Sequence, residues 1–151
     1  MTERKPLKRD PALAPLSRQH HQGLLLARLL RKDAPAYKGL PTDPEGKKAY
    51  LLQFFENELK PHFLLEEQKL FPAVQQFTPE LNNLTDQLLH EHRQMEQMVS
   101  YIEKTNGADP LQLHELGLLL EQHIRTEERV LLEKLQEKLP QEVLDKLAEV
   151  L

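Results

Sequence analysis

Apolar side chains recur three or four residues apart along four long stretches of this 151-residue chain. This spacing places them on one face of an α-helix, and no stretch shows the alternation expected of a β-strand. Prolines and glycines separate the stretches, which predicts long helices over about 15–32, 43–76, 79–105 and 109–138, and a short helix over 140–151. We therefore predict an all-α, up-down-up-down four-helix bundle with a short additional C-terminal helix.

Boundary residues support these limits. Asp43 and Asp109 are each followed by a proline, which is the order expected for an N-cap and the first turn of a helix. Pro61 lies inside the second range, where its ring crowds the preceding turn, so we expect a bend there. The basic residues 1–12 are predicted to form a disordered N-terminus, and residues 13–151 a single domain.

Composition excludes several classes of site and partner. The chain has no cysteine, which excludes disulfides, thiolate ligands and iron–sulfur clusters and is typical of a cytoplasmic protein. Its net charge is −4 with both signs interspersed, so nucleic acid is not an expected partner. The longest apolar run, "GLLLARLL", is too short to cross a bilayer, and no signal-peptide pattern is present. We expect a cytoplasmic monomer or homodimer with no membrane partner.

Polar side chains interrupt each of the four apolar stripes near its middle. The first and third stripes each carry one histidine, and the second and fourth each carry a histidine followed four residues later by a glutamate. Because residues four apart share a helix face, each glutamate should point the same way as its histidine. The six inward polar residues are His20, His62, Glu66, His92, His123 and Glu127.

These six residues need a shared explanation. A single inward histidine is usually satisfied by a hydrogen bond, and a single buried glutamate is usually half of an ion pair. Two carboxylates in one small core are costly unless compensated, and no lysine or arginine lies at the same level of the stripes. A bound cation would compensate them, and imidazole nitrogens with carboxylate oxygens suit iron and similar metals. The sequence therefore predicts a metal site.

The other histidines fall outside the stripes. His21 shares its face with polar residues and is expected at the rim, His90 is expected in solvent, and His114 lies near the start of its helix. Glu96 lies four residues after His92, and a glutamate at such a position is usually exposed to solvent. Whether Glu96 or His21 adds to the site is left open. No catalytic residue and no organic cofactor site is assigned.

Four segments of the chain resemble the hemerythrin-like, or HHE cation-binding, family. They are "PLSRQHHQGLLLARLL", "PHFLLEEQKLFP", "LLHEHRQMEQM" and "HIRTEERVLL", and the resemblance runs from about residue 15 to 135. It implies a four-helix bundle with two iron ions, bridged by carboxylates and by an oxo or hydroxo group, with manganese or zinc as alternative metals. Carried over residue by residue, the implied ligands are the same six residues, His20, His62, Glu66, His92, His123 and Glu127.

The chain departs from the oxygen-carrying hemerythrins in its third segment. Those proteins have a pair of histidines four residues apart there, whereas Leu88 precedes His92 in this chain. The pattern resembles members with four histidines and two glutamates, in which both metals would have the same ligands. We expect His20 and His62 on one metal and His92 and His123 on the other.

Three functions fit such a site. The resemblance favours non-catalytic binding or sensing of O2, or of NO or peroxide, as the small gaseous or peroxide partner. The first alternative is a di-iron oxidoreductase or an iron-donor repair protein. The second alternative is a structural metal-binding bundle that acts through a surface recognised by an unknown protein partner. A ferritin-like site is disfavoured because the chain has no glutamate followed three residues later by histidine.

Overall fold

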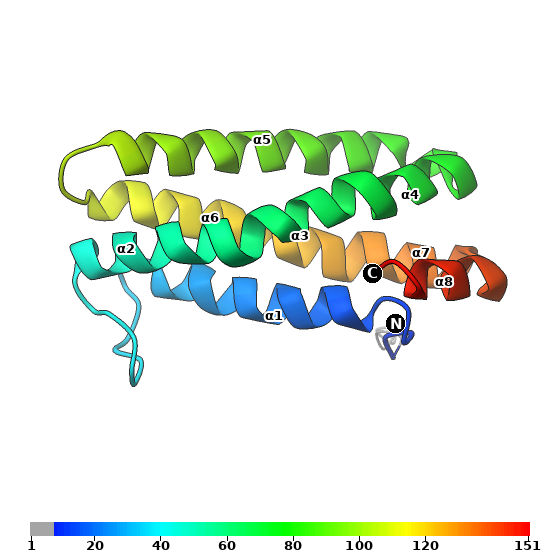
Figure 1. The fold of residues 1–151 in the computed structure, drawn as a ribbon, viewed down its shortest axis with the longest axis horizontal. Helices are drawn as coiled ribbons and strands as arrows, with labels where there is room; N and C mark the ends of the chain where they lie inside the picture. Colours follow the sequence, from blue (N-terminus) through cyan, green and yellow to red (C-terminus); the bar gives the residue numbers. More distant parts are fainter. Residues whose placement is uncertain (1–7) are drawn as a thin grey trace, which may run out of the picture.

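The structure is a computed structural model that describes residues 8–151, and residues 1–7 lie outside the described residues. Four long helical rods run in alternating directions and pack side by side (Figure 1). The first rod is α1 (Ala14–Leu29). The third rod is the 3-10 turn η3 (Pro79–Leu81) followed by α5 (Asn82–Lys104). The predicted all-α, up-down-up-down bundle is confirmed.

The second and fourth rods each contain more than one kind of helix. The second consists of α2 (Pro44–Phe54), η1 (Phe55–Leu59), α3 (Lys60–Leu65), η2 (Glu66–Leu70) and α4 (Phe71–Phe77). The fourth consists of α6 (Pro110–Thr126), η4 (Glu127–Leu131) and α7 (Leu132–Lys138). The segments η1, η2 and η4 are single π-helical turns, and the backbone runs through them without a break. The short helix α8 (Gln141–Ala148) then folds back along one end of the bundle (Figure 1).

The predicted caps are present. The side chain of Asp43 accepts a hydrogen bond from the backbone N–H of Gly46, and that of Asp109 accepts one from Leu111. Both satisfy N–H groups that have no partner within the first turn. Gly107, with a φ of +74°, supplies the left-handed residue that reverses the chain before α6.

Two of the π-helical turns precede a proline. The backbone N–H of Lys60 donates to Phe55, just before Pro61, and the N–H of Phe71 donates to Glu66, just before Pro72. A proline has no N–H and its ring crowds the carbonyl one turn earlier, so a widened turn relieves the conflict. A π-helical turn thus lies directly before Pro61, where a bend was expected, and the rod continues beyond it.

Residues 8–12 lie against the bundle. Arg9 donates to the backbone carbonyl of Glu128, the Asp10 N–H donates to Gln136, and the side chain of Ala12 is buried. These residues belong to the predicted disordered N-terminus, and the polar groups of Arg9 and Asp10 find partners on the fourth rod. The first seven residues of that N-terminus lie outside the described part of the chain.

Apolar side chains fill the bundle on both sides of a polar middle layer. One cluster lies toward α8 and includes Leu16, Leu70, Leu88 and Leu131, with Leu144 and Leu147 of α8 packed into it. The other cluster lies toward the α5–α6 turn and includes Leu26, Leu59, Met95, Leu120 and Ile124. Val130 lies three residues after Glu127, a spacing that would place it on the inward face, but it is exposed, because the π-helical turn η4 shifts the register of the stripe there.

Helices α1 and α6 approach each other closely at Gly117. A Cβ atom at this position would lie 2.6 Å from the backbone oxygen of Ala27 and 3.2 Å from Leu30 Cβ. The absence of a side chain therefore sets the distance between the first and fourth rods. Within residues 8–151, every helix is too short or too polar to cross a membrane.

Candidate metal centre

Six polar side chains from all four rods meet between the two apolar clusters. His20 comes from α1, His62 from α3, His92 from α5 and His123 from α6, while Glu66 and Glu127 are the first residues of η2 and η4. Both carboxylates are fully buried, and the imidazoles are between 0% and 7% exposed. The structure thus brings together all six residues selected from the sequence.

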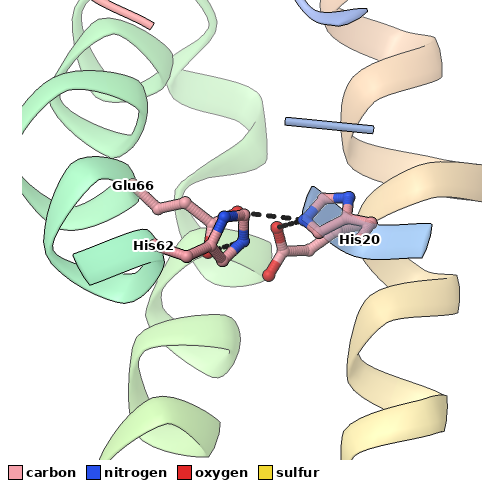
Figure 2. Close-up of side chains that lie close together, drawn as sticks. His20, His62 and Glu66 are labelled. Atoms are coloured by element: carbon pink, nitrogen blue, oxygen red, sulfur yellow. Dashed lines mark ion pairs between the residues drawn. The ribbon is translucent and has the colours of Figure 1, made fainter. Parts of the chain in front are cut away.

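His20 and His62 form one half of the cluster with the two carboxylates. The Nε2 atom of His20 lies 3.1 Å from Glu127 Oε2 and 3.5 Å from Glu66 Oε2. The Nε2 atom of His62 lies 3.3 Å from Glu66 Oε1. Figure 2 shows His20 reaching toward His62 and Glu66, which belong to the second rod.

His92 and His123 form the other half with the same two carboxylates. The Nε2 atom of His92 lies 3.1 Å from Glu66 Oε1 and 3.8 Å from Glu127 Oε1. The Nε2 atom of His123 lies 2.5 Å from Glu127 Oε1. In each half, one donor atom from every residue lies within 4.8 Å of the others, so the structure contains two four-residue groups that share Glu66 and Glu127.

These separations fit two metal ions. Two ligands at right angles on one metal, each about 2.1 Å from it, lie about 3 Å apart. Most of the nitrogen–oxygen distances fall near this value. The same distances would also suit hydrogen bonds, so the hydrogen-bonding partners of these atoms decide between the two interpretations.

Several atoms at the centre lack a hydrogen-bond partner within the described part of the chain. They are Nε2 of His20, His92 and His123, together with both carboxylate oxygens of Glu66 and of Glu127. Buried polar atoms are normally paired, and buried carboxylates without partners are especially costly. All of these atoms point to the same interior region. The residues present therefore fit a pair of cations, and the site has the donor types that iron and similar metals accept.

The Nδ1 atom of each central histidine forms a hydrogen bond with a residue outside the six-residue centre. The Nδ1 atoms of His20, His92 and His123 lie 2.7, 2.8 and 2.7 Å from carboxylate oxygens of Glu128, Glu67 and Glu91, respectively. The Nδ1 atom of His62 lies 2.5 Å from Gln19 Oε1. Because these oxygens only accept, each Nδ1 carries a proton and donates it. In a neutral imidazole, Nε2 is then left with a free lone pair, as a metal ligand requires.

Two phenylalanines hold the His92 ring from its faces. The ring of Phe63 stacks 4.0 Å from that of His92, and the ring of Phe71 lies 5.7 Å away on a nearly parallel plane. Both side chains are buried. They restrict the rotation of the imidazole and keep bulk water from this half of the centre.

Without a cation, protons would supply the positive charge. Burial lowers the pKa of the His92 imidazole, but Glu127 and Glu66 outweigh it and raise that pKa to about 10. Burial likewise opposes the charge on His123, whose pKa Glu127 and Glu91 raise to about 9. Burial and Glu127 raise the pKa of Glu66, yet the histidines lower it to about 2. The centre thus requires positive charge between its carboxylates.

The remaining sequence candidates lie away from the centre. His21 and His90 are exposed, and the Nδ1 atom of the partly buried His114 accepts a hydrogen bond from the backbone N–H of Lys32. Glu96 pairs with Arg93 at the surface. The two four-residue groups found among the described residues contain neither His21 nor Glu96.

The outer partners were missed by the sequence analysis. Gln19, Glu67, Glu91 and Glu128 were not selected among the candidate residues. Each of these four residues is the immediate neighbour of a central residue in the sequence. Their position next to a central residue was the one sequence feature that could have identified these four partners. It was not decisive, because neighbouring residues on a helix point about 100° apart.

Comparison with known proteins identifies one family. A family model described as the hemerythrin HHE cation binding domain matches residues 12–135, which is most of the chain. The matched range contains all six central residues and their four outer partners. Neither the curated proteins nor the solved structures gave a significant match.

Proposed function

The chain belongs to the hemerythrin HHE cation-binding family, and from this premise we propose that it binds two iron ions at the centre formed by its four rods. His20 and His62 would hold one ion, and His92 and His123 the other, while Glu66 and Glu127 would each serve both. Manganese and zinc are the alternative metals, since they accept the same donors.

One observation carries this proposal. Seven buried nitrogen and oxygen atoms, from His20, Glu66, His92, His123 and Glu127, form no hydrogen bond with any of residues 8–151 and face one interior region. A centre stabilised only by protein hydrogen bonds would align the imidazole nitrogens with the carboxylate oxygens, which lie 2.5 to 3.8 Å from them. The donors instead form two groups that share both carboxylates, which is the arrangement that a pair of cations needs.

We further propose that the protein binds or senses O2, NO or peroxide. Iron held by such donors would supply exchange between the ferrous and ferric states and an affinity for these small ligands. The chain's own residues support this role because the outer acceptors fix the proton of each imidazole on Nδ1 and turn Nε2 toward the interior, while Phe63, Phe71 and the two apolar clusters surround the centre.

Metal analysis and an absorption spectrum of the purified protein test the proposal. We expect about two irons per chain and the charge-transfer absorption of ferric iron. His62→Ala and His123→Ala should each lower the iron content, whereas His90→Ala, which changes an exposed histidine, should not. One zinc per chain and no visible absorption would contradict the iron proposal and favour a structural metal.

A second experiment separates binding from catalysis. A binding or sensing protein should form a reversible adduct with O2 or NO in its reduced state, without consuming an oxidant. Repeated turnover of added peroxide with a reductant would instead support the oxidoreductase alternative. Transfer of iron from the protein to an acceptor would support the iron-donor alternative.

A further inference from the structure

The four central imidazoles are held by unlike partners. Each Nδ1 of His20, His92 and His123 donates to a carboxylate, whereas Nδ1 of His62 donates to the amide oxygen of Gln19. A carboxylate acceptor is anionic and an amide acceptor is neutral. The distances are similar, between 2.5 and 2.8 Å, so the difference between the four contacts is one of charge.

This difference divides the centre into unequal halves. The half that contains His20 and His62 has one carboxylate and one amide as outer partners. The half that contains His92 and His123 has two carboxylates. The inner donors of the two halves are otherwise the same in kind, two imidazoles with the same two shared carboxylates.

Gln19 also lines a surface pocket that reaches His62. A pocket of about 260 Å³ lies between α1 and the second rod, and its lining includes Arg18, Gln19, Gln22, Glu58 and His62. Gln19 is exposed, and His62, at 7%, is the most exposed of the six central residues. The outer carboxylates of the other three histidines are less exposed, with values of 14% to 25%.

We propose that Gln19 is a positioning residue that makes the two metals of this centre electronically unequal, with the metal on the His20–His62 side the easier of the two to reduce. This inference rests on the proposed two-iron function and adds to it a difference between the two sites. It replaces the sequence-based expectation that identical ligand sets make the two metals alike.

The physical reason lies in the hydrogen bond at Nδ1. A carboxylate that accepts this proton pulls it away from the ring and makes Nε2 a stronger electron donor. An amide oxygen is neutral and pulls the Nδ1 proton away from the ring less strongly. A metal held by His20 and His62 would therefore receive less electron density than one held by His92 and His123, and its ferric state would be less stabilised relative to its ferrous state.

Gln19→Glu tests the inference by giving all four imidazoles a carboxylate partner. In protein loaded with iron-57, the Mössbauer spectrum of the parent protein should resolve two unlike irons, and in the variant the two signals should converge. The first reduction step, in which one electron converts one ferric iron to ferrous, should become harder. A tenfold change in that equilibrium corresponds to about 59 mV for one electron.

Two further variants control for charge and for position. Gln22→Glu adds the same charge to the same pocket, but no hydrogen bond joins Gln22 to a central histidine among the described contacts, so it should shift the potential much less. Glu91→Gln makes the reciprocal change at His123, leaving one amide in each half. It should also make the irons alike, while making the reduction easier rather than harder.

The outcomes separate this inference from the proposed function. Two irons with identical signals in the parent protein, or equal potential shifts for Gln19→Glu and Gln22→Glu, would overturn the inequality while leaving the two-iron proposal intact. A protein that holds fewer than two irons would overturn both. Unlike signals that converge in Gln19→Glu and Glu91→Gln, with opposite changes in potential, would establish the role of Gln19.

Discussion

Glu66 and Glu127 face each other across the core, and each is the first residue of a π-helical turn in its own rod. The two turns are closed in the same way, since the N–H of Phe71 donates to the Glu66 carbonyl and that of Leu132 to the Glu127 carbonyl. Only the first of these turns precedes a proline. The π-helical turn at Glu127 therefore has no proline to explain it, and such turns occur frequently at functional sites.

Removing the charge of a shared carboxylate should empty the centre. Glu66→Gln keeps the shape of the side chain but leaves both proposed metals with one anionic ligand fewer. We expect less than one metal per chain after desalting, measured by inductively coupled plasma mass spectrometry. Glu96→Gln is the matched control, because Glu96 pairs with Arg93 at the surface. Full metal occupancy in Glu66→Gln would contradict the assignment of Glu66 as a ligand.

Loss of an outer partner should weaken metal binding without abolishing it. Glu128 accepts hydrogen bonds from His20 Nδ1 and from the Ser17 hydroxyl. Outer partners of this kind are typically worth about 10–100-fold in metal affinity. Glu128→Ala should lower the affinity by about this factor in a competition titration with a chelator. Glu142→Ala, an exposed change on α8, should not alter it.

The metal-free and metal-loaded proteins should respond oppositely to pH. In the metal-free protein, the pKa values of His92 and His123 are raised to about 10 and about 9. Their protonation stabilises the fold fully below their unfolded pKa of about 6.5, and this stability is lost as pH rises toward 9–10. Metal binding displaces the same protons, so the affinity for metal should rise over that interval.

Thermal unfolding at pH 6 and pH 9 measures both trends. The melting temperature of the metal-free protein should be lower at pH 9 than at pH 6. The increase in melting temperature that added metal causes should be larger at pH 9. Metal should be lost in mild acid, since protons then compete for the imidazoles. A metal-free protein whose melting temperature rises between pH 6 and pH 9 would contradict the pairing of these histidines with the buried carboxylates.

A methyl group at Gly117 should destabilise the bundle. The added Cβ of Gly117→Ala would lie 2.6 Å from a backbone oxygen of α1, which cannot move aside without shifting the helix. Overpacking of this kind costs about 1–3 kcal/mol, which urea unfolding can measure. Gly23→Ala is the matched control, because the one close neighbour of its Cβ among the described residues would be the end of the Ile124 side chain, 2.7 Å away, which can rotate. Equal effects of the two changes would contradict this account of the α1–α6 contact.

Much of the fold could be predicted from sequence patterns that extend over only a few residues. The caps at Asp43 and Asp109, the helical stripes and the absence of a strand pattern each depend on interactions within a few residues, which the order of side chains specifies directly. The inward direction of His62 and Glu66 followed from the same periodicity. Helical spacing fails at Val130, where a π-helical turn changes the register, and it gives no sign of the contacts that residues 8–12 make with a distant rod.

The sequence by itself determined which side chains face the core and which chemical groups they carry, because helical periodicity is a local property. Only the tertiary structure decided which groups meet. It placed Glu67 of the second rod on His92 of the third, and Gln19 of the first rod on His62 of the second. These contacts join residues whose positions depend on how the rods pack and rotate, which no spacing along one helix specifies. The charge of each outer partner, and with it the proposed inequality of the two metals, follows from that packing.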